Sequence, residues 1–102
     1  MFLYNVTVGI DKEIEKEWLL WVKENYLPAA LGTGLLKESR MYRVVSQDDD
    51  TSVSYCIQFF ATHIEHVVQY LDTQTNGIIE AHRQKFIERH VVFNTLLEEV
   101  NP

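Results

Sequence analysis

Residues 17–28 read EWLLWVKENYLP, and this stretch holds both tryptophans and one of the two prolines of the chain. Its large side chains, together with Ile14, recur at steps of three and four residues, which gathers them on one side of an α-helix. They are Trp18, Trp21, Val22 and Tyr26. We therefore expect a helix that packs this side against a sheet. Pro28 disfavours helical geometry at the preceding residue and lacks an N–H donor, so the helix should stop or kink near Tyr26, before a short turn at residues 29–31.

Two other stretches alternate between apolar and other residues with the period of two that half-buried strands show. Residues 2–10 form the first, and residues 51–61 form the second, which should be a central strand. Their apolar sets are Phe2, Tyr4, Val6, Val8 and Ile10, and Val53, Tyr55, Ile57 and Phe59. Residues 35–46 carry charges that fit an edge strand, and a turn at residues 47–50 follows them. Residues 89–98 predict the last strand.

Polar residues mark where the helical regions begin. Asp11 can accept a hydrogen bond from a free backbone N–H, which places the start of the first helix near Lys12. Thr62, followed three residues later by Glu65, predicts a capping box at the start of the second helical region. Asn76-Gly77 interrupts the apolar period of that region, so we expect two helical pieces there.

The predicted order is β-α-β-β-α-β, which matches the ferredoxin-like plan of the α+β class. Right-handed crossovers put both helices on one face of a four-stranded antiparallel sheet with the spatial order 4-1-3-2. The chain has 102 residues, a length that fits one domain over residues 1–102.

Composition and charge argue against several classes of function. The formal net charge is -6 at pH 7, which repels nucleic-acid phosphates and anionic lipid heads, so we expect no nucleic-acid or membrane partner. Residues 1–10 are apolar, but Asn5 and Thr7 interrupt them and no basic residue precedes them, so they predict neither a signal peptide nor a membrane span. The single cysteine, Cys56, cannot form a disulfide within the chain, which indicates a reducing, cytoplasmic location.

Several segments carry a resemblance to known sequences. They are residues 4–8 (YNVTV), Glu17-Trp18-Leu19 with Trp21 and Pro28, residues 30–34 (ALGTG), residues 55–59 (YCIQF), and Phe86 with residues 91–93 (VVF). They resemble a bacterial family of unknown function in the dimeric α+β-barrel superfamily, over nearly the whole chain. The resemblance implies the ferredoxin-like fold and a dimer.

That superfamily includes cofactor-free monooxygenases of the antibiotic-biosynthesis type, muconolactone isomerases and haem-handling enzymes, so the resemblance implies no single reaction. Related sequences place a histidine in a Glu-His-x-Pro segment where this chain has Tyr26 before Leu27-Pro28. Any role of that histidine does not carry over to this chain.

The histidines predict no metal site and no cofactor. His63 and His66 lie one helical turn apart, but two ligands without a third leave a metal site half built. His82 and His90 flank the end of the second helical region. A histidine in such a place more often bonds to a backbone carbonyl or a carboxylate than to haem.

Other polar and aromatic groups are also read as structural. Asp48, Asp49 and Asp50 lack the alternate spacing of a calcium loop, so they predict a solvated turn. Trp18 and Trp21 predict core residues, because a helix that faces a sheet buries such side chains. Cys56 lies in the middle of a strand, where a thiol behaves as a small apolar group.

Strand parity locates where a site would lie. If Tyr4, Val6, Tyr55 and Ile57 face the helices, the residues between them face the other side of the sheet. If Met41 and Val45 of the edge strand also face the helices, Arg40 and Tyr42 lie beside Gln58 and Cys56. A shift of one residue would reverse this placement of the edge strand.

We predict a ligand-binding set on that second face, while no residue is assigned as catalytic. The set is Asn5, Thr7, Arg40, Tyr42 and Gln58. A polar dimer interface is the alternative for the same residues. The face is also predicted to carry the apolar residues Leu3, Phe60, Val92 and Leu96, so a homodimer should cover it and close the two sheets into one barrel.

These patterns favour a small homodimeric binding or accessory module without catalysis of its own. The alternative is a cofactor-independent monooxygenase-like or isomerase-like enzyme that holds a small aromatic substrate in the barrel pocket. Such an enzyme needs a convergent acid or base, for which His90, Arg40 and Tyr42 are the candidates, in a water-poor cavity.

Overall fold

The computed structural model describes residues 1–47 and 49–102, and these form four strands with helices between them. The strands are β1 (Phe2–Asp11), β2 (Glu38–Arg43), β3 (Ser52–Ala61) and β4 (His90–Glu98). The helical segments are η1 (Lys12–Ile14), α1 (Glu15–Trp21), η2 (Val22–Tyr26), α2 (Leu27–Gly32), η3 (Val45–Gln47), α3 (Ile64–Gln74) and α4 (Ile78–Lys85). The described elements follow the order that the sequence predicts.

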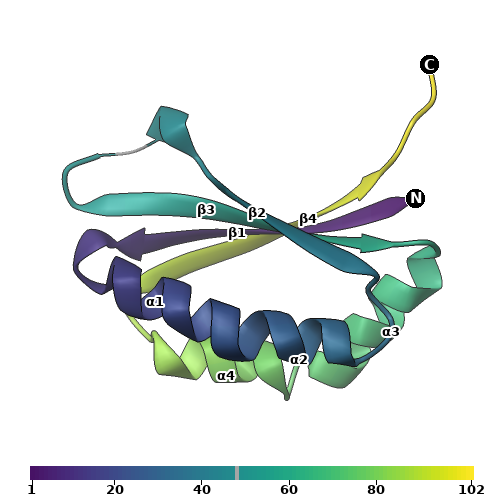
Figure 1. The fold of residues 1–102 in the computed structure, drawn as a ribbon, viewed down its shortest axis with the longest axis horizontal. Helices are drawn as coiled ribbons and strands as arrows, with labels where there is room; N and C mark the ends of the chain where they lie inside the picture. The colour runs from purple at the N-terminus through teal and green to yellow at the C-terminus, as the bar shows by residue number, and fades with distance from the viewer. Residues whose placement is uncertain (48) are drawn as a thin grey trace.

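The strands form one antiparallel sheet with the order β2-β3-β1-β4, which is the predicted order 4-1-3-2 read from the other edge. β1 pairs with β3 along its whole length, from Phe2 opposite Ala61 to Asp11 opposite Ser52. Helices α1, α2, α3 and α4 lie on one face of this sheet (Figure 1). The fold is therefore the ferredoxin-like α+β plan, and we call the face away from these helices the open face.

The core lies between the sheet and the first helical region. Trp18 of α1 and Val22 and Tyr26 of η2 are buried in one cluster with the helix-facing residues of β1 and β3. The buried strand residues are Tyr4, Val6, Val8, Ile10, Val53, Tyr55, Ile57, Phe59 and Ala61. The Trp18 ring is fully enclosed and lies 5.2 Å from the ring of Tyr55. The alternation of the two strands and the period of the helix thus predict the core correctly.

The first helical region does not end before Pro28. α1 widens into a π-helical turn, η2, in which the N–H of Leu27 bonds to the carbonyl of Val22. The chain then continues through Pro28 as α2 as far as Gly32, so the expected turn at residues 29–31 is wrong. Pro28 lies in the first turn of α2, where its missing N–H is tolerated. The π-helical turn before it also changes the pattern of backbone hydrogen bonds that the proline would otherwise interrupt.

Neither predicted helix cap forms. The Asp11 side chain makes no capping bond at η1, because its carboxylate instead pairs with Arg89, with Nε and Oδ2 2.6 Å apart. The residue with extended backbone before α3 is His63 rather than Thr62, and no side chain caps this helix. The capping box of Thr62 and Glu65 is therefore wrong by one residue. The separate helices α3 and α4 confirm the two expected helical pieces.

Strand pairing decides which side chains of β4 face the helices. Val92 and Leu96 lie opposite Val8 and Tyr4, both of which are buried on the helix side. The expectation that Val92 and Leu96 lie on the open face is therefore wrong. The open face instead carries Val91, Phe93, Thr95 and Leu97. Both alternating sets of β4 contain apolar residues, so the sequence did not distinguish its two faces.

The edge strand β2 pairs in the expected register. Met41 lies opposite Ile57 and packs against the core, so β2 has the predicted parity. β2 ends at Arg43, however, and Val45 lies in η3 with 75% of its surface exposed. The expectation that Val45 joins the helix side is therefore wrong, because the strand is shorter than the sequence suggested.

Candidate functional site

The open face carries a row of polar side chains that crosses three strands. Asn5 and Arg40 both lie opposite Gln58, while Thr7 and Tyr42 both lie opposite Cys56. The five residues of the predicted ligand-binding set therefore share one face, with Cys56 between them. We call Asn5, Thr7, Arg40, Tyr42 and Gln58 the polar row.

Contacts within the polar row leave hydrogen-bonding capacity free. Asn5 donates from Nδ2 to Oγ1 of Thr7 at 3.0 Å, and that oxygen lies 3.6 Å from the Cys56 sulfur. The guanidinium of Arg40 lies over the Phe60 ring, 5.5 Å from its centre, and 3.9 Å from the Glu38 carboxylate. These contacts orient Arg40 along the strand. The row thus presents amide, hydroxyl and guanidinium groups suited to a polar ligand.

Apolar side chains flank the polar row on β4. Val91, Phe93 and Leu97 expose 69%, 59% and 43% of their surface, respectively. Leu3 lies opposite Leu97, and Thr7 lies opposite Phe93, so this apolar strip adjoins the row directly. An apolar strip beside polar groups is typical of a surface that a partner covers.

A buried histidine, His82, forms a second polar centre on the other side of the sheet. It leaves only 4% of its surface exposed, and its Nε2 accepts a hydrogen bond from Nε1 of Trp18 at 2.9 Å. Burial, reinforced by the nearby His90, lowers the pKa of His82 from 6.5 to about 4. His82 is therefore a neutral imidazole at neutral pH. The sequence predicted a structural histidine with a hydrogen-bond partner at this position, but it did not identify Trp18 as that partner.

His90 lies beside His82 at the start of β4. Its Nδ1 is 2.5 Å from the carbonyl oxygen of Phe86, and the two imidazole centres are 5.0 Å apart. His90 lies opposite Ile10 on the helix side of the sheet. The structure therefore separates it from Arg40 and Tyr42, with which it was considered as a catalytic acid or base.

Three buried tyrosines extend this helix-side centre. The Tyr4 ring lies 5.9 Å from that of Tyr70, and Tyr26 stacks on Phe59 at 6.0 Å. Burial raises the pKa of Tyr4 to about 12. Burial, together with the neighbouring tyrosines, also raises the pKa of Tyr26 well above its ordinary value. Within residues 1–47 and 49–102, the Tyr70 hydroxyl is buried without a hydrogen-bond partner.

The two histidines line a cavity of about 110 Å³ between α4 and the sheet. The walls come from β1, η2, α4 and β4, and Tyr4, Val6, Tyr26, Ile79, His82, Arg83, His90, Val92 and Asn94 line them. We call this space the histidine cavity. It was missed from the sequence because its walls come from four segments that only the fold brings together. The one available signal was the helical spacing of Ile78, Ile79, His82 and Phe86.

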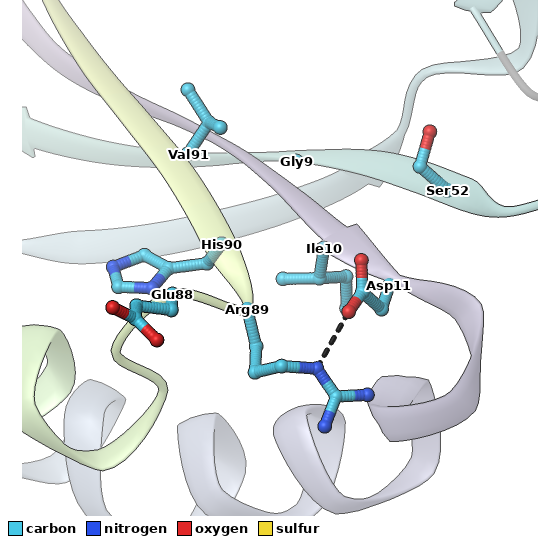
Figure 2. Close-up of a pocket in the computed structure, with 8 residues that line it drawn as sticks. All are labelled: Gly9, Ile10, Asp11, Ser52, Glu88, Arg89, His90 and Val91. Carbon is cyan, nitrogen blue, oxygen red and sulfur yellow. Dashed lines mark hydrogen bonds and ion pairs between the residues drawn. The ribbon is translucent and has the colours of Figure 1, made fainter.

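A wider hollow of about 220 Å³ lies at the end of the sheet where β4 begins. Figure 2 shows Arg89 reaching across it to the Asp11 carboxylate, with Glu88 and His90 on the neighbouring side. Arg89 also lies 3.4 Å from Glu13. The Arg89–Asp11 ion pair thus joins the end of β1 to the start of β4 across this hollow. Glu88 has a left-handed backbone, with φ of 66°.

The other histidines and aspartates considered in the sequence form no metal site among the described residues. The rings of His63 and His66 lie 5.3 Å apart, but in the described part of the chain no group of three His, Cys, Asp or Glu residues could hold a metal ion. Asp49 accepts bonds from the backbone N–H groups of Thr51 and Ser52 at 2.8 and 2.7 Å, which lowers its pKa to about 2. Asp48 lies outside the described residues.

A family model described as "Domain of unknown function (DUF4286)" matches residues 1–100. The chain belongs to this family. Among curated proteins, the sequence finds no significant match. In the described part of this DUF4286 chain, every helix is too short or too polar to span a bilayer.

Solved structures similar to the DUF4286 chain share its fold at low identity. A candidate antibiotic biosynthesis monooxygenase from Deinococcus radiodurans has 14% identity and a TM-score of 0.72, with 100% of this chain and 95% of that chain covered. A dimeric ferredoxin-like protein from an uncultured marine organism has 16% identity and a TM-score of 0.69, with 100% and 97% covered. A mutant form of SnoaB, a cofactor-independent oxygenase from Streptomyces nogalater, has 11% identity and a TM-score of 0.67, with 99% and 95% covered.

Proposed function

We propose that this DUF4286 protein is a homodimeric binding module that encloses a small polar molecule between the open faces of two sheets. The observation that carries the proposal is the open face itself, where the polar row lies beside the exposed apolar strip of β4. Helices α1, α2, α3 and α4 cover the other face of the sheet (Figure 1). Exposed apolar side chains grouped along one strand, which water would otherwise cover, favour a partner surface.

A second copy of the chain fits that surface. In a two-fold arrangement the same strip meets itself, so Phe93 and Leu97 of each copy would bury apolar area against the other. A specific interface of this kind covers on the order of 800 Å² per partner. The polar row would then lie between the two sheets. The likeness to a dimeric ferredoxin-like protein agrees with this arrangement.

Binding rather than catalysis suits the polar row. Its members are two amides, two hydroxyls and a guanidinium, which recognise the acceptor and donor groups of a ligand. Neither a histidine nor a carboxylate is among them, so the row lacks the usual general base. The single positive charge, on Arg40, favours a ligand with a carboxylate or carbonyl group.

Oligomeric state tests the assembly. Phe93→Glu places a charge on the open face, while Val92→Glu places the same charge on the other side of the same strand. Light scattering at micromolar concentration should give a dimer for the wild-type protein and for Val92→Glu, and a monomer for Phe93→Glu. A monomeric wild-type protein would contradict the proposal.

Binding of benzoate tests the polar row, because this probe combines a carboxylate with a small ring. Arg40→Met should weaken benzoate binding at least tenfold, the loss expected for one charge-assisted hydrogen bond. Arg43→Met is the matched control, since Arg43 lies on the same strand with the opposite parity. Equal losses in both variants would place the binding elsewhere.

The second candidate function is a cofactor-independent monooxygenase-like or isomerase-like enzyme acting on a small aromatic substrate. The histidine cavity favours it, because His90 offers a general base beside a largely apolar cavity. Oxygen uptake and product formation with hydroxylated aromatic compounds, in the absence of any added cofactor, test this activity. His90→Gln should abolish such turnover, whereas Arg40→Met should not change it.

A further inference from the structure

The two imidazoles at the histidine cavity are held in opposite tautomers. An indole N–H can only donate, so Nε2 of His82 accepts the bond from Trp18 and the neutral ring carries its proton on Nδ1. A carbonyl oxygen can only accept, so Nδ1 of His90 carries the proton that it shares with Phe86. Each ring therefore has one nitrogen left, which is a donor in His82 and an acceptor in His90.

These two remaining nitrogens have no partner of their own in the described part of the chain. The ring centres are 5.0 Å apart and the planes are inclined by 73°, yet no hydrogen bond joins the rings. His82 is 4% exposed and lines the cavity. Nδ1 of His82 is not among the fully buried atoms that lack a partner in the described residues, so solvent in the cavity can reach it. A group inside the cavity that both accepts and donates would satisfy both nitrogens.

The cavity has no free charge to attract an ion. The low pKa of His82, about 4, keeps that ring neutral at neutral pH. Arg83, which also lines the cavity, is held by Glu80 through bonds of 2.9 and 2.7 Å. A metal ion at Nδ1 of His82 would displace the ring proton while Trp18 still donates to Nε2, which a neutral imidazole does not allow. The occupant is therefore expected to be uncharged.

The size of the cavity limits the occupant. Its volume is about 110 Å³, compared with roughly 150 Å³ for an apolar protein cavity that takes up benzene. Val6, Tyr26, Ile79 and Val92 provide apolar or aromatic walls. This volume is closer to that of a site for one ring than to that of a site for a fused ring system.

We propose that the histidine cavity binds a small uncharged molecule with a single ring and a hydroxyl group. The hydroxyl oxygen accepts the N–H of His82, and the hydroxyl proton is donated to Nε2 of His90. The ring lies against the walls formed by Tyr26 and Val92. This site is separate from the polar row, because it lies on the opposite side of the sheet, and the proposal rests on the second candidate function only in placing an aromatic ligand in this cavity.

Phenol, anisole and toluene are matched probes for this site. All three carry one ring of the same size, but only phenol can both donate and accept, while anisole can only accept. Binding is followed by the NMR shifts of the His82 and His90 ring protons during titration. We expect wild-type protein to bind phenol about tenfold more tightly than anisole, the value of one hydrogen bond, and to bind toluene no better than anisole.

Two variants and a control complete the experiment. His90→Phe removes the acceptor and should bring the phenol-to-anisole ratio close to one, whereas His63→Phe, at the exposed start of α3, should leave the ratio unchanged. Val92→Trp fills the cavity with a larger side chain from β4 and leaves the Trp18–His82 and His90–Phe86 hydrogen bonds in place. It should therefore abolish binding of all three probes. Circular dichroism checks that each variant is folded.

Three results would overturn the proposal. They are equal affinities for phenol and anisole in the wild-type protein, unperturbed His82 and His90 signals at millimolar phenol, and wild-type phenol binding by Val92→Trp. Shifts confined to the side-chain amides of Asn5 and Gln58 would place phenol at the polar row and would also overturn it. Unperturbed histidine signals would indicate that the cavity holds only water. None of these results depends on whether the protein is a dimer.

Discussion

The indole nitrogen of Trp18 lies 2.9 Å from Nε2 of His82, and this buried hydrogen bond joins α1 to α4 across 64 residues of sequence. The Trp21 ring packs against the same imidazole at 5.7 Å between centres, and the Phe86 ring at 5.8 Å. The bond therefore fixes the orientation of His82 within an aromatic cluster. It also determines which nitrogen of the neutral imidazole carries the proton.

Trp18→Phe tests the energetic value of this bond. Phenylalanine keeps most of the apolar volume but removes the donor, so Nε2 of His82 loses its partner, and we expect a loss of about 1–3 kcal/mol in the free energy of unfolding. Trp18→Ala should cost more, about 3–5 kcal/mol, because it also leaves a cavity. Trp21→Phe is the control. Urea unfolding measures all three, and equal effects of Trp18→Phe and Trp21→Phe would show that the bond contributes little.

The stability of the protein should fall in mild acid because of His82. In the unfolded chain this histidine gains a proton near pH 6.5, whereas in the folded protein its pKa of about 4 keeps it neutral. The unfolded state therefore binds more protons between these values, so stability declines as the pH falls from about 6.5 to about 4. The contribution of this one group is on the order of 3 kcal/mol.

Urea unfolding at pH 7 and pH 4.5 measures this decline, and NMR titration identifies the group responsible. The ring signal of His82 should stay constant from pH 8 to pH 5. His63→Gln, which removes an exposed imidazole, serves as a control. Titration of His82 near pH 6.5 would rule out this explanation.

The fold was predictable because its signals are local and agree with one another. Alternation in residues 2–10 and 51–61 fixed the faces of β1 and β3, since one set in each strand is clearly apolar. The same parity predicted that Asn5, Thr7 and Gln58 share the open face. For β4 the argument failed, because Val91 and Val92 are equally apolar and only pairing with β1 distinguishes them.

The helix-side centre could not be predicted, because its contacts join distant segments. His82 meets Trp18 through tertiary packing, and nothing in the sequence near either residue signals the bond. The path of the chain through Pro28 depends on the π-helical turn before it, a local adjustment without a sequence signature. The cap expected at Thr62 is missing because the start of α3 lies one residue later along the chain. Hydrophobic periodicity does not locate the end of a strand or helix to within one residue.

Glu88 offers a test of backbone strain between α4 and β4. Its φ of 66° lies in the left-handed region, which costs a residue with a side chain about 1–2 kcal/mol relative to glycine. Glu88→Gly should therefore raise the free energy of unfolding by about 1 kcal/mol, after allowance for the greater freedom of glycine in the unfolded chain. Glu88→Val should lower it, because a branched side chain suits this region poorly. Both variants remove the carboxylate, so comparison of their thermal unfolding isolates the backbone effect, and identical midpoints would contradict it.

Deletion of single hydroxyl groups in the core tests the hydrogen bonding of the buried tyrosines. In the described part of the chain, the Tyr70 hydroxyl is buried near the Tyr26 hydroxyl but makes no hydrogen bond of full geometry, whereas the Tyr55 hydroxyl donates to the Glu15 carboxylate. Tyr70→Phe removes a desolvated polar group, so it should raise the free energy of unfolding by about 1 kcal/mol. Tyr55→Phe removes a bond to a charged acceptor, so it should lower this free energy by about 1.5–3 kcal/mol. Both changes delete one oxygen atom from a buried ring, which makes their urea unfolding midpoints at pH 7 directly comparable. A loss of stability in Tyr70→Phe would show that its hydroxyl has a partner in solution, for which the neighbouring Tyr26 hydroxyl is the first candidate.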